Sequence, residues 1–184
     1  MKYSYDPYKF CGEVEKLYDI LEWVGEYSWH SPFSCNIESR LLISLYQAKQ
    51  GLQTFSKIGP NDMANEAFSG SIIHLFIYGH LFGNGILEDF AKEFCSTPWY
   101  SKKIDCFPGV NKIDYYSRRV FFLYGNLGEQ LIYKNHSGGR NLRFDPKITK
   151  KSIIDLVSLT LGMIPIDRRK HAFWNAIEIM THLK

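Results

Sequence analysis

Residues 71–87, SIIHLFIYGHLFGNGIL, form the most apolar stretch of this 184-residue chain. The stretch contains two histidines, three glycines and an asparagine, and it is short for a membrane span. It therefore predicts a helix buried in the core of a globular domain. The Gly83-Asn84-Gly85 triplet predicts a turn at its end.

Helical patterns continue on both sides of this stretch. Upstream, Asp6-Pro7 precedes apolar residues at helical spacing, and a second helix spans about 36–58 before Gly59-Pro60. The buried helix begins near Asp62, and a short helix follows it over 86–95. Downstream, helices are predicted from three capping residues, which are Asn111, Thr149 and Asp167. The chain is therefore expected to be all-α, a compact single-domain bundle of about six or seven helices over residues 1–184.

Residues 120–134 are compatible with two structures. Apolar residues fit one long helix, at Tyr116, Val120, Leu123, Leu127 and Leu131. The alternative is a hairpin that pairs 120–124 with 130–134 around a Gly-Asn-Leu-Gly turn. The longer helical window favours the helix.

Composition excludes several classes of protein. Hydrophobic residues make up 45% and charged residues 22% of the chain, so disordered and collagen-like classes do not fit. No apolar leader follows Met1, and the four cysteines include no C-x-x-C pair. We expect a cytoplasmic protein with reduced thiols and no membrane association.

Charge is distributed unevenly along the chain. Residues 1–133 contain 12 Lys/Arg and 15 Asp/Glu, whereas residues 134–184 contain 10 Lys/Arg and 4 Asp/Glu. A basic C-terminal end of this kind is typical of a surface that meets a polyanion, although it also fits a solvated face without a partner.

Standard catalytic and cofactor motifs are absent from the sequence. The chain has no phosphate-binding glycine loop, no H-E-x-x-H and no G-x-S-x-G. His74 and His80 are six residues apart, which places them on different faces of a helix. The sequence therefore predicts no metal site, no cofactor and no catalytic residue.

The polar segment 135–141, Asn-His-Ser-Gly-Gly-Arg-Asn, is the most suggestive candidate loop. Gly138-Gly139 can turn backbone N–H groups toward an anion, His136 can transfer a proton near neutral pH, and Arg140 can bind phosphate. A solvated turn between two helices would show the same composition.

Residues 131–139, Leu-Ile-Tyr-Lys-Asn-His-Ser-Gly-Gly, together with the following helix, resemble the HEPN superfamily of helical nucleotide- and RNA-associated domains. Active members carry an R-x(4–6)-H motif for RNA cleavage. In this chain the positions where that arginine would stand are Glu129, Gln130 and Leu131. The resemblance therefore implies a non-catalytic version of the domain.

The last predicted helix places cations where the helix dipole disfavours them. Arg168, Arg169, Lys170 and His171 follow Asp167 in its first turn. Either a carboxylate such as Asp167 or Asp155 neutralises them within the fold, or they face a polyanion. The candidate anion- or nucleic-acid-binding residues are Lys134, Arg140, Arg143, Lys150, Lys151, Arg168, Arg169 and Lys170.

Three functions follow from these patterns. The leading hypothesis is a non-catalytic helical binding or regulatory protein that engages nucleic acid or an anionic partner protein through its basic C-terminal end. One alternative is an RNA- or nucleotide-processing enzyme that uses the 134–140 loop, with His136 and Arg140 as catalytic residues. A further alternative is a homo-oligomeric interaction module, because 13 Phe, 12 Tyr and 4 Trp are more aromatic rings than one core of this size buries.

Overall fold

The computed structural model describes residues 11–12, 14–16, 36–96, 109–136, 144–169 and 171. Within these ranges the regular structure is helical and contains no strand, which confirms the predicted all-α class. Two helical segments, 11–16 and 166–171, are described in part. The complete helices are α2 (Ile37–Ile58), α3 (Asp62–Phe82), α4 (Ile86–Ser96), α5 (Lys112–Asn135) and α6 (Pro146–Met163).

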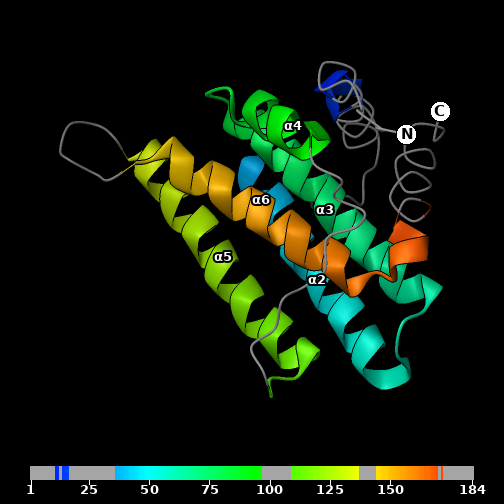
Figure 1. The fold of residues 1–184 in the computed structure, drawn as a ribbon. Coiled ribbons are helices and arrows are strands. Elements are labelled where there is room, and N and C mark those ends of the chain that lie inside the picture. The colour runs from blue at the N-terminus through cyan, green and yellow to red at the C-terminus, as the bar shows by residue number, and fades with distance from the viewer. Residues whose placement is uncertain are drawn as a thin grey trace, which may run out of the picture.

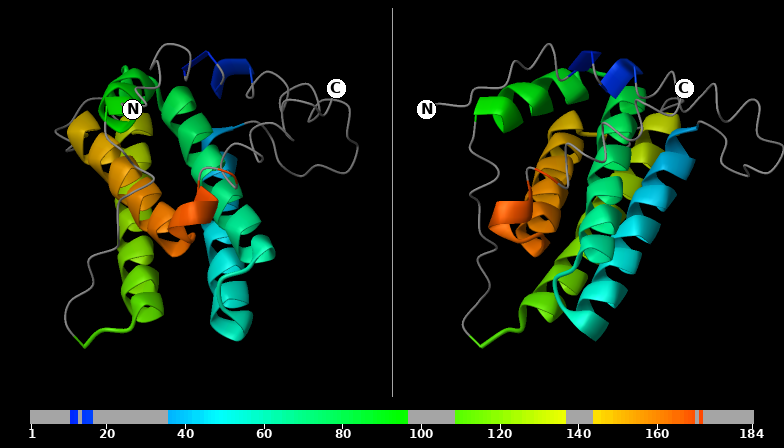
Figure 2. Two further views of the ribbon diagram at one scale, coloured as in Figure 1. Left: turned by 45° about the vertical axis from the view of Figure 1, so that its right-hand side comes forward. Right: turned by 90° about the vertical axis from the view of Figure 1, so that its right-hand side faces the viewer.

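The four long helices form a bundle in which neighbours run antiparallel (Figure 1). Side-chain contacts give the order around the bundle as α2, α3, α6 and α5. Ser44 meets Ser71 between α2 and α3, and Arg119 meets Asp155 between α5 and α6. The short helix α4 lies across the end of the bundle where α3 ends (Figure 2). As a result, α3 and α5 face each other diagonally through the core.

Helix α3 is the core of the bundle, as the apolar stretch predicted. From Ser71 onward nearly every side chain of this helix is buried, including Phe76, Ile77 and Tyr78. The helix ends at a turn in which Gly83, Asn84 and Gly85 all have positive φ. Glycine adopts such angles at no steric cost, and this turn sends the chain into α4.

Helix α2 buries a different line of residues from the one its apolar pattern suggests. Its buried residues are Arg40, Ser44, Ala48 and Gly51, whereas Leu41, Leu45 and Leu52 are half-buried and Leu42 is exposed. Small side chains let α2 approach α3 closely. A methyl group added at Gly51 would lie 2.6 Å from the Phe68 ring, so the contact between α2 and α3 requires a glycine there.

A buried cluster of three hydroxyl groups joins α2, α3 and α5. The Ser44 hydroxyl donates to the Ser71 carbonyl at 2.8 Å. The Tyr124 hydroxyl lies 2.5 Å from the Ser44 hydroxyl and 3.1 Å from that of Ser71. Burial raises the pKa of Tyr124 to about 12, so its hydroxyl stays protonated. These hydroxyls satisfy one another where water is excluded, which fixes the relative positions of the three helices.

Helix α5 confirms the helical alternative for residues 120–134. Its buried face includes the five apolar residues that fit the helical window. Two more tyrosines make polar contacts between helices. Tyr78 of α3 donates to the Leu127 carbonyl at 3.1 Å, and the Tyr116 hydroxyl lies 3.2 Å from that of Thr160 in α6. A hairpin would lose these contacts.

Two predicted helix starts are wrong by a few residues. Helix α6 begins at Pro146, and the Asp145 side chain, rather than Thr149, caps it by accepting from the Lys147 N–H at 2.9 Å. Asp145-Pro146 supplies both a cap and a proline in the first turn, which is the stronger start signal. The last helix begins at Ile166, because the Arg168 and Arg169 N–H groups donate to the Pro165 carbonyl. Asp167 therefore lies in its first turn.

The hydroxyl cluster predicts a stability difference between two tyrosines. Tyr124→Phe removes a buried hydrogen-bonding group, so the free energy of unfolding should fall by about 1–2 kcal/mol. Tyr46→Phe is the control, because that hydroxyl makes an exposed bond with Gln50; its cost should be below about 0.5 kcal/mol. Urea denaturation measures both, and equal losses would contradict the structural role of the cluster.

Candidate functional site

The candidate basic residues lie in two groups at opposite ends of α6. Lys134, Lys150 and Lys151 lie where α5 ends and α6 begins, because the Asp145 N–H donates to the Gln130 side chain at 2.8 Å. Arg168 and Arg169 follow the other end of α6. A helix of 18 residues is about 27 Å long, so the structure does not bring the two groups together. Arg140, Arg143 and Lys170 lie outside the described residues.

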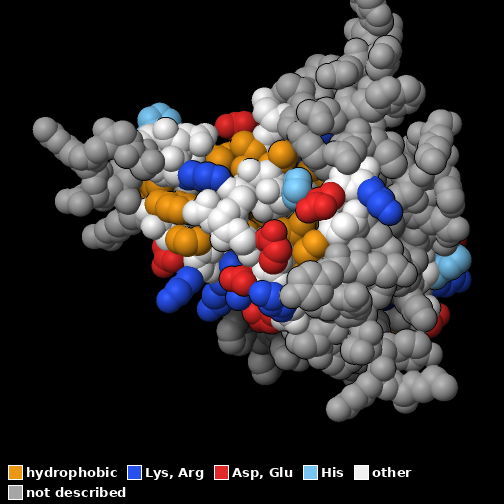
Figure 3. Space-filling model, turned by 90° about the horizontal axis from the view of Figure 1, so that it is seen from above, with side chains coloured by type: hydrophobic (Ala, Val, Ile, Leu, Met, Phe, Trp, Pro, Cys, Tyr) orange, Lys and Arg blue, Asp and Glu red, His pale blue; other side chains and the backbone are white. Residues whose placement is uncertain are grey.

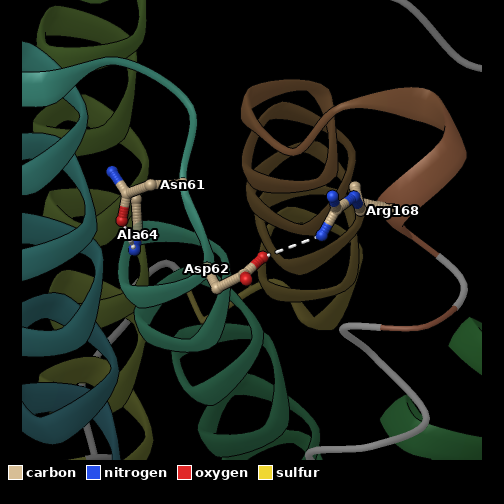
Figure 4. A network of polar contacts seen from close by, with 4 residues as sticks. All are labelled: Asn61, Asp62, Ala64 and Arg168. Carbon is tan, nitrogen blue, oxygen red and sulfur yellow. Dashed lines mark hydrogen bonds and ion pairs between the residues drawn. The ribbon is translucent and has the colours of Figure 1, made fainter.

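Arg168 is paired within the fold. Its guanidinium donates to the Asp62 carboxylate at 3.0 Å, in the first turn of α3 (Figure 4). Asn61 caps the same helix by accepting from the Ala64 N–H. The neutralising carboxylate is therefore Asp62, whereas Asp155 pairs with Arg119 at 3.7 Å. The pair is exposed and holds the last helix beside the start of α3.

Arg169 is a packing residue. Only 3% of its surface is exposed, and its Nε donates to the Ile164 carbonyl at 2.8 Å. Burial lowers the pKa of this guanidinium. A side chain so enclosed cannot contact a phosphate without unpacking the end of α6.

The group at the other end of α6 is also largely engaged. Lys134 donates to the carbonyl of Phe82, the last residue of α3, and lies 4.4 Å from the centre of the Phe82 ring. Burial lowers the pKa of Lys134. Lys150 pairs with Glu93 of α4 at 3.7 Å, whereas Lys151 is exposed. Seen from the α4 end, basic and acidic side chains are interspersed on the described surface (Figure 3).

The histidines show no catalytic arrangement in the part of the chain that the structure describes. His136 ends α5, and its Nδ1 lies 3.0 Å from the Ile132 carbonyl. Gly138-Gly139 and Arg140 lie outside the described residues. His74 is largely buried, and burial together with the nearby Arg40 lowers its pKa to about 4, so it is neutral at physiological pH. No group of three His, Cys, Asp or Glu side chains is placed to hold a metal ion among the described residues.

A surface that the sequence analysis did not single out lies on α2 and α5. On α5, Phe121, Gly125, Gly128 and Ile132 follow one another at spacings of four, three and four, so they form one stripe. Phe121 is 64% exposed and Ile132 57% exposed. Asn135 and Tyr124, on the adjoining side of α5, contact Glu38 and Ser44 of α2. The stripe therefore borders α2.

Helix α2 adds its own residues to this surface. Leu42 is 65% exposed, and Leu45 is half-buried beside it. Exposed charges flank the leucines, with Glu38 toward one end and Lys49 toward the other. We call the combined surface the α2–α5 face. It comprises Glu38, Leu42, Leu45 and Lys49 of α2 and Arg118, Phe121, Phe122, Gly125, Gly128, Glu129 and Ile132 of α5. The 4-3-4 spacing on α5 is visible in the sequence, but which faces the bundle buries is not.

The described helices include none that is long and apolar enough to cross a membrane.

The two adjacent arginines predict different effects of substitution. Arg169→Ala removes a buried hydrogen bond and its packing, so it should lower the free energy of unfolding by about 2 kcal/mol or more. Arg168→Ala breaks an exposed ion pair and should cost less than about 1 kcal/mol. Chemical denaturation of both variants is the measurement. If neither loses stability and both lose affinity for RNA, the two arginines form a nucleic-acid surface instead.

Comparison with known proteins gives no relative from which a function could be inferred. No family model, no curated protein and no solved structure matches the chain. The resemblance of residues 131–139 to the HEPN superfamily stays a prediction from the sequence.

Proposed function

We propose that this chain is a non-catalytic helical binding protein of the cytoplasm that engages a protein partner through its α2–α5 face. One observation carries the proposal: Leu42, Phe121 and Ile132 are each more than half exposed on one side of the bundle. Contiguous apolar residues rimmed by charges are typical of protein–protein interfaces.

Two glycines add support. Gly125 and Gly128 lie inside α5, where each costs about 1 kcal/mol of helix stability relative to alanine. A methyl group added at either position would meet no described atom within 4 Å, and neither glycine has positive φ. The packing of the described chain does not require them, unlike Gly51. Because neither glycine has a side chain, the helix surface between Phe121 and Ile132 leaves room for the side chains of a partner.

The surroundings of the basic residues support a protein partner over a nucleic acid. Four of the described candidate cations contact other parts of the chain: Lys134, Lys150, Arg168 and Arg169. A nucleic-acid surface would have to break those contacts. Engagement of nucleic acid through the basic C-terminal end, including Arg140, Arg143 and Lys170, stays a prediction from the sequence.

Photo-crosslinking from one position on the face and one position off it tests the proposal. Phe121 lies on the face and is 64% exposed, whereas Ile148, 41% exposed, lies in the first turn of α6, on another side of the bundle. Benzoylphenylalanine placed at position 121, in cells that produce the protein, should give a discrete protein adduct that nuclease treatment leaves intact. The same probe at position 148 is the control and should give little adduct.

Equal adducts from both positions would contradict the proposal, because the face would then have no special role. So would an adduct at position 121 that disappears on nuclease treatment, because the partner would then be a nucleic acid.

A further inference from the structure

On each helix of the α2–α5 face, one exposed acidic residue and one exposed basic residue are separated by the same number of positions. On α2, Glu38 and Lys49 are 11 residues apart, and on α5, Arg118 and Glu129 are also 11 residues apart. Eleven residues make three helical turns, so each pair lies on one side of its helix about 16 Å apart. All four side chains are exposed.

The acids gather at one end of the face and the bases at the other. Helices α2 and α5 run antiparallel, as the Ser44–Tyr124 and Glu38–Asn135 contacts show. Glu38 near the start of α2 therefore lies toward the same end as Glu129 in the second half of α5. Lys49 and Arg118 lie toward the opposite end. Within the described chain no ion pair joins these four residues.

This pattern is complementary to itself. A two-fold axis that lies in the plane of the face, at right angles to its helices, brings two copies face to face and places the acidic end of one on the basic end of the other. The α2 helices of the two copies then lie antiparallel to each other, and so do the α5 helices. Glu38 opposes Lys49 of the second copy, and Arg118 opposes its Glu129. One axis serves both helices, because the midpoints of the two pairs lie at the level of the Ser44–Tyr124 contact.

The apolar residues of the face follow the same register. The exposed Leu42 opposes the half-buried Leu45 of the second copy, and the exposed Phe122 opposes its Gly125. The large Phe122 side chain would therefore meet a glycine. Large side chains opposite small ones allow two helices to interdigitate.

We infer that the α2–α5 face pairs with the same face of a second copy of this chain, as a two-fold symmetric dimer. The inference rests on the proposed function and names its partner. Glu38 pairs with the second copy's Lys49, Arg118 pairs with its Glu129, and symmetry repeats both pairs. Closed two-fold pairing of one surface patch with itself is the commonest form of oligomer.

A charge-swap experiment with purified protein tests this dimer by sedimentation equilibrium. The wild-type protein should have twice the 21.4 kDa mass of the chain. The acid-reversed variant, Glu38→Lys with Glu129→Lys, and the base-reversed variant, Lys49→Glu with Arg118→Glu, each place like charges together. Each should raise the dissociation constant at least about a hundredfold. Mixed in equal amounts, they should form a heterodimer, because all four pairs are then of opposite sign.

A matched control keeps the charge change and moves it off the face. Lys147→Glu with Lys151→Glu reverses two exposed lysines on α6, and this variant should dimerise as the wild type does. Circular dichroism checks that every variant is folded.

Three results would overturn the dimer: wild-type protein of one chain mass at high micromolar concentration, face variants that still dimerise, or a mixture that stays monomeric. None of them decides the proposed function, because a crosslink from position 121 to a different protein would uphold a protein-binding face without self-association.

Discussion

The buried contact among the Ser44, Ser71 and Tyr124 hydroxyls sets the arrangement on which the rest of the structure depends. These hydroxyls come from three helices and lie where water is excluded, so each needs the other two. The close approach of Gly51 to the Phe68 ring holds the same two helices, α2 and α3, in register. Because Tyr124 reaches across from α5, the position of α5 beside α2 is fixed by the same contact. The α2–α5 face is the outer side of this arrangement.

The sequence predicted where the helices lie in the chain. It predicted less well which face of each helix is buried. Capping residues and glycine turns are local signals, so the predicted start of α5 at Asn111 and the predicted ends of α2 and α3 at Gly59 and Gly83 agree with the structure. The burial of Arg40 and Ser44 in place of the leucines of α2 depends on partners far away in the chain. Helical periodicity alone cannot show that a serine finds two hydroxyls in α3 and α5. Thr149 is the wrong cap because its place shortly before Ile153 and Ile154 is a weaker start signal than Asp145-Pro146.

The candidate site could be predicted in composition but not in placement. The basic excess of residues 134–184 is real, yet Asp62, more than a hundred residues away, pairs with Arg168. The carbonyl of Phe82 likewise binds Lys134. Such long-range partners turn an apparent basic patch into internal contacts. By contrast, the glycines of α5 stand out only once the structure shows that no described neighbour would clash with a methyl group there.

The most direct test of self-pairing through the α2–α5 face is hydroxyl-radical footprinting of the purified protein across a dilution series. Side chains at an interface lose reactivity when it forms, so Leu42 and Phe121 should become less reactive as the protein concentration rises. Ile148, exposed on α6 outside the face, should keep its reactivity. Parallel behaviour of Phe121 and Ile148 at every concentration would contradict self-pairing through this face.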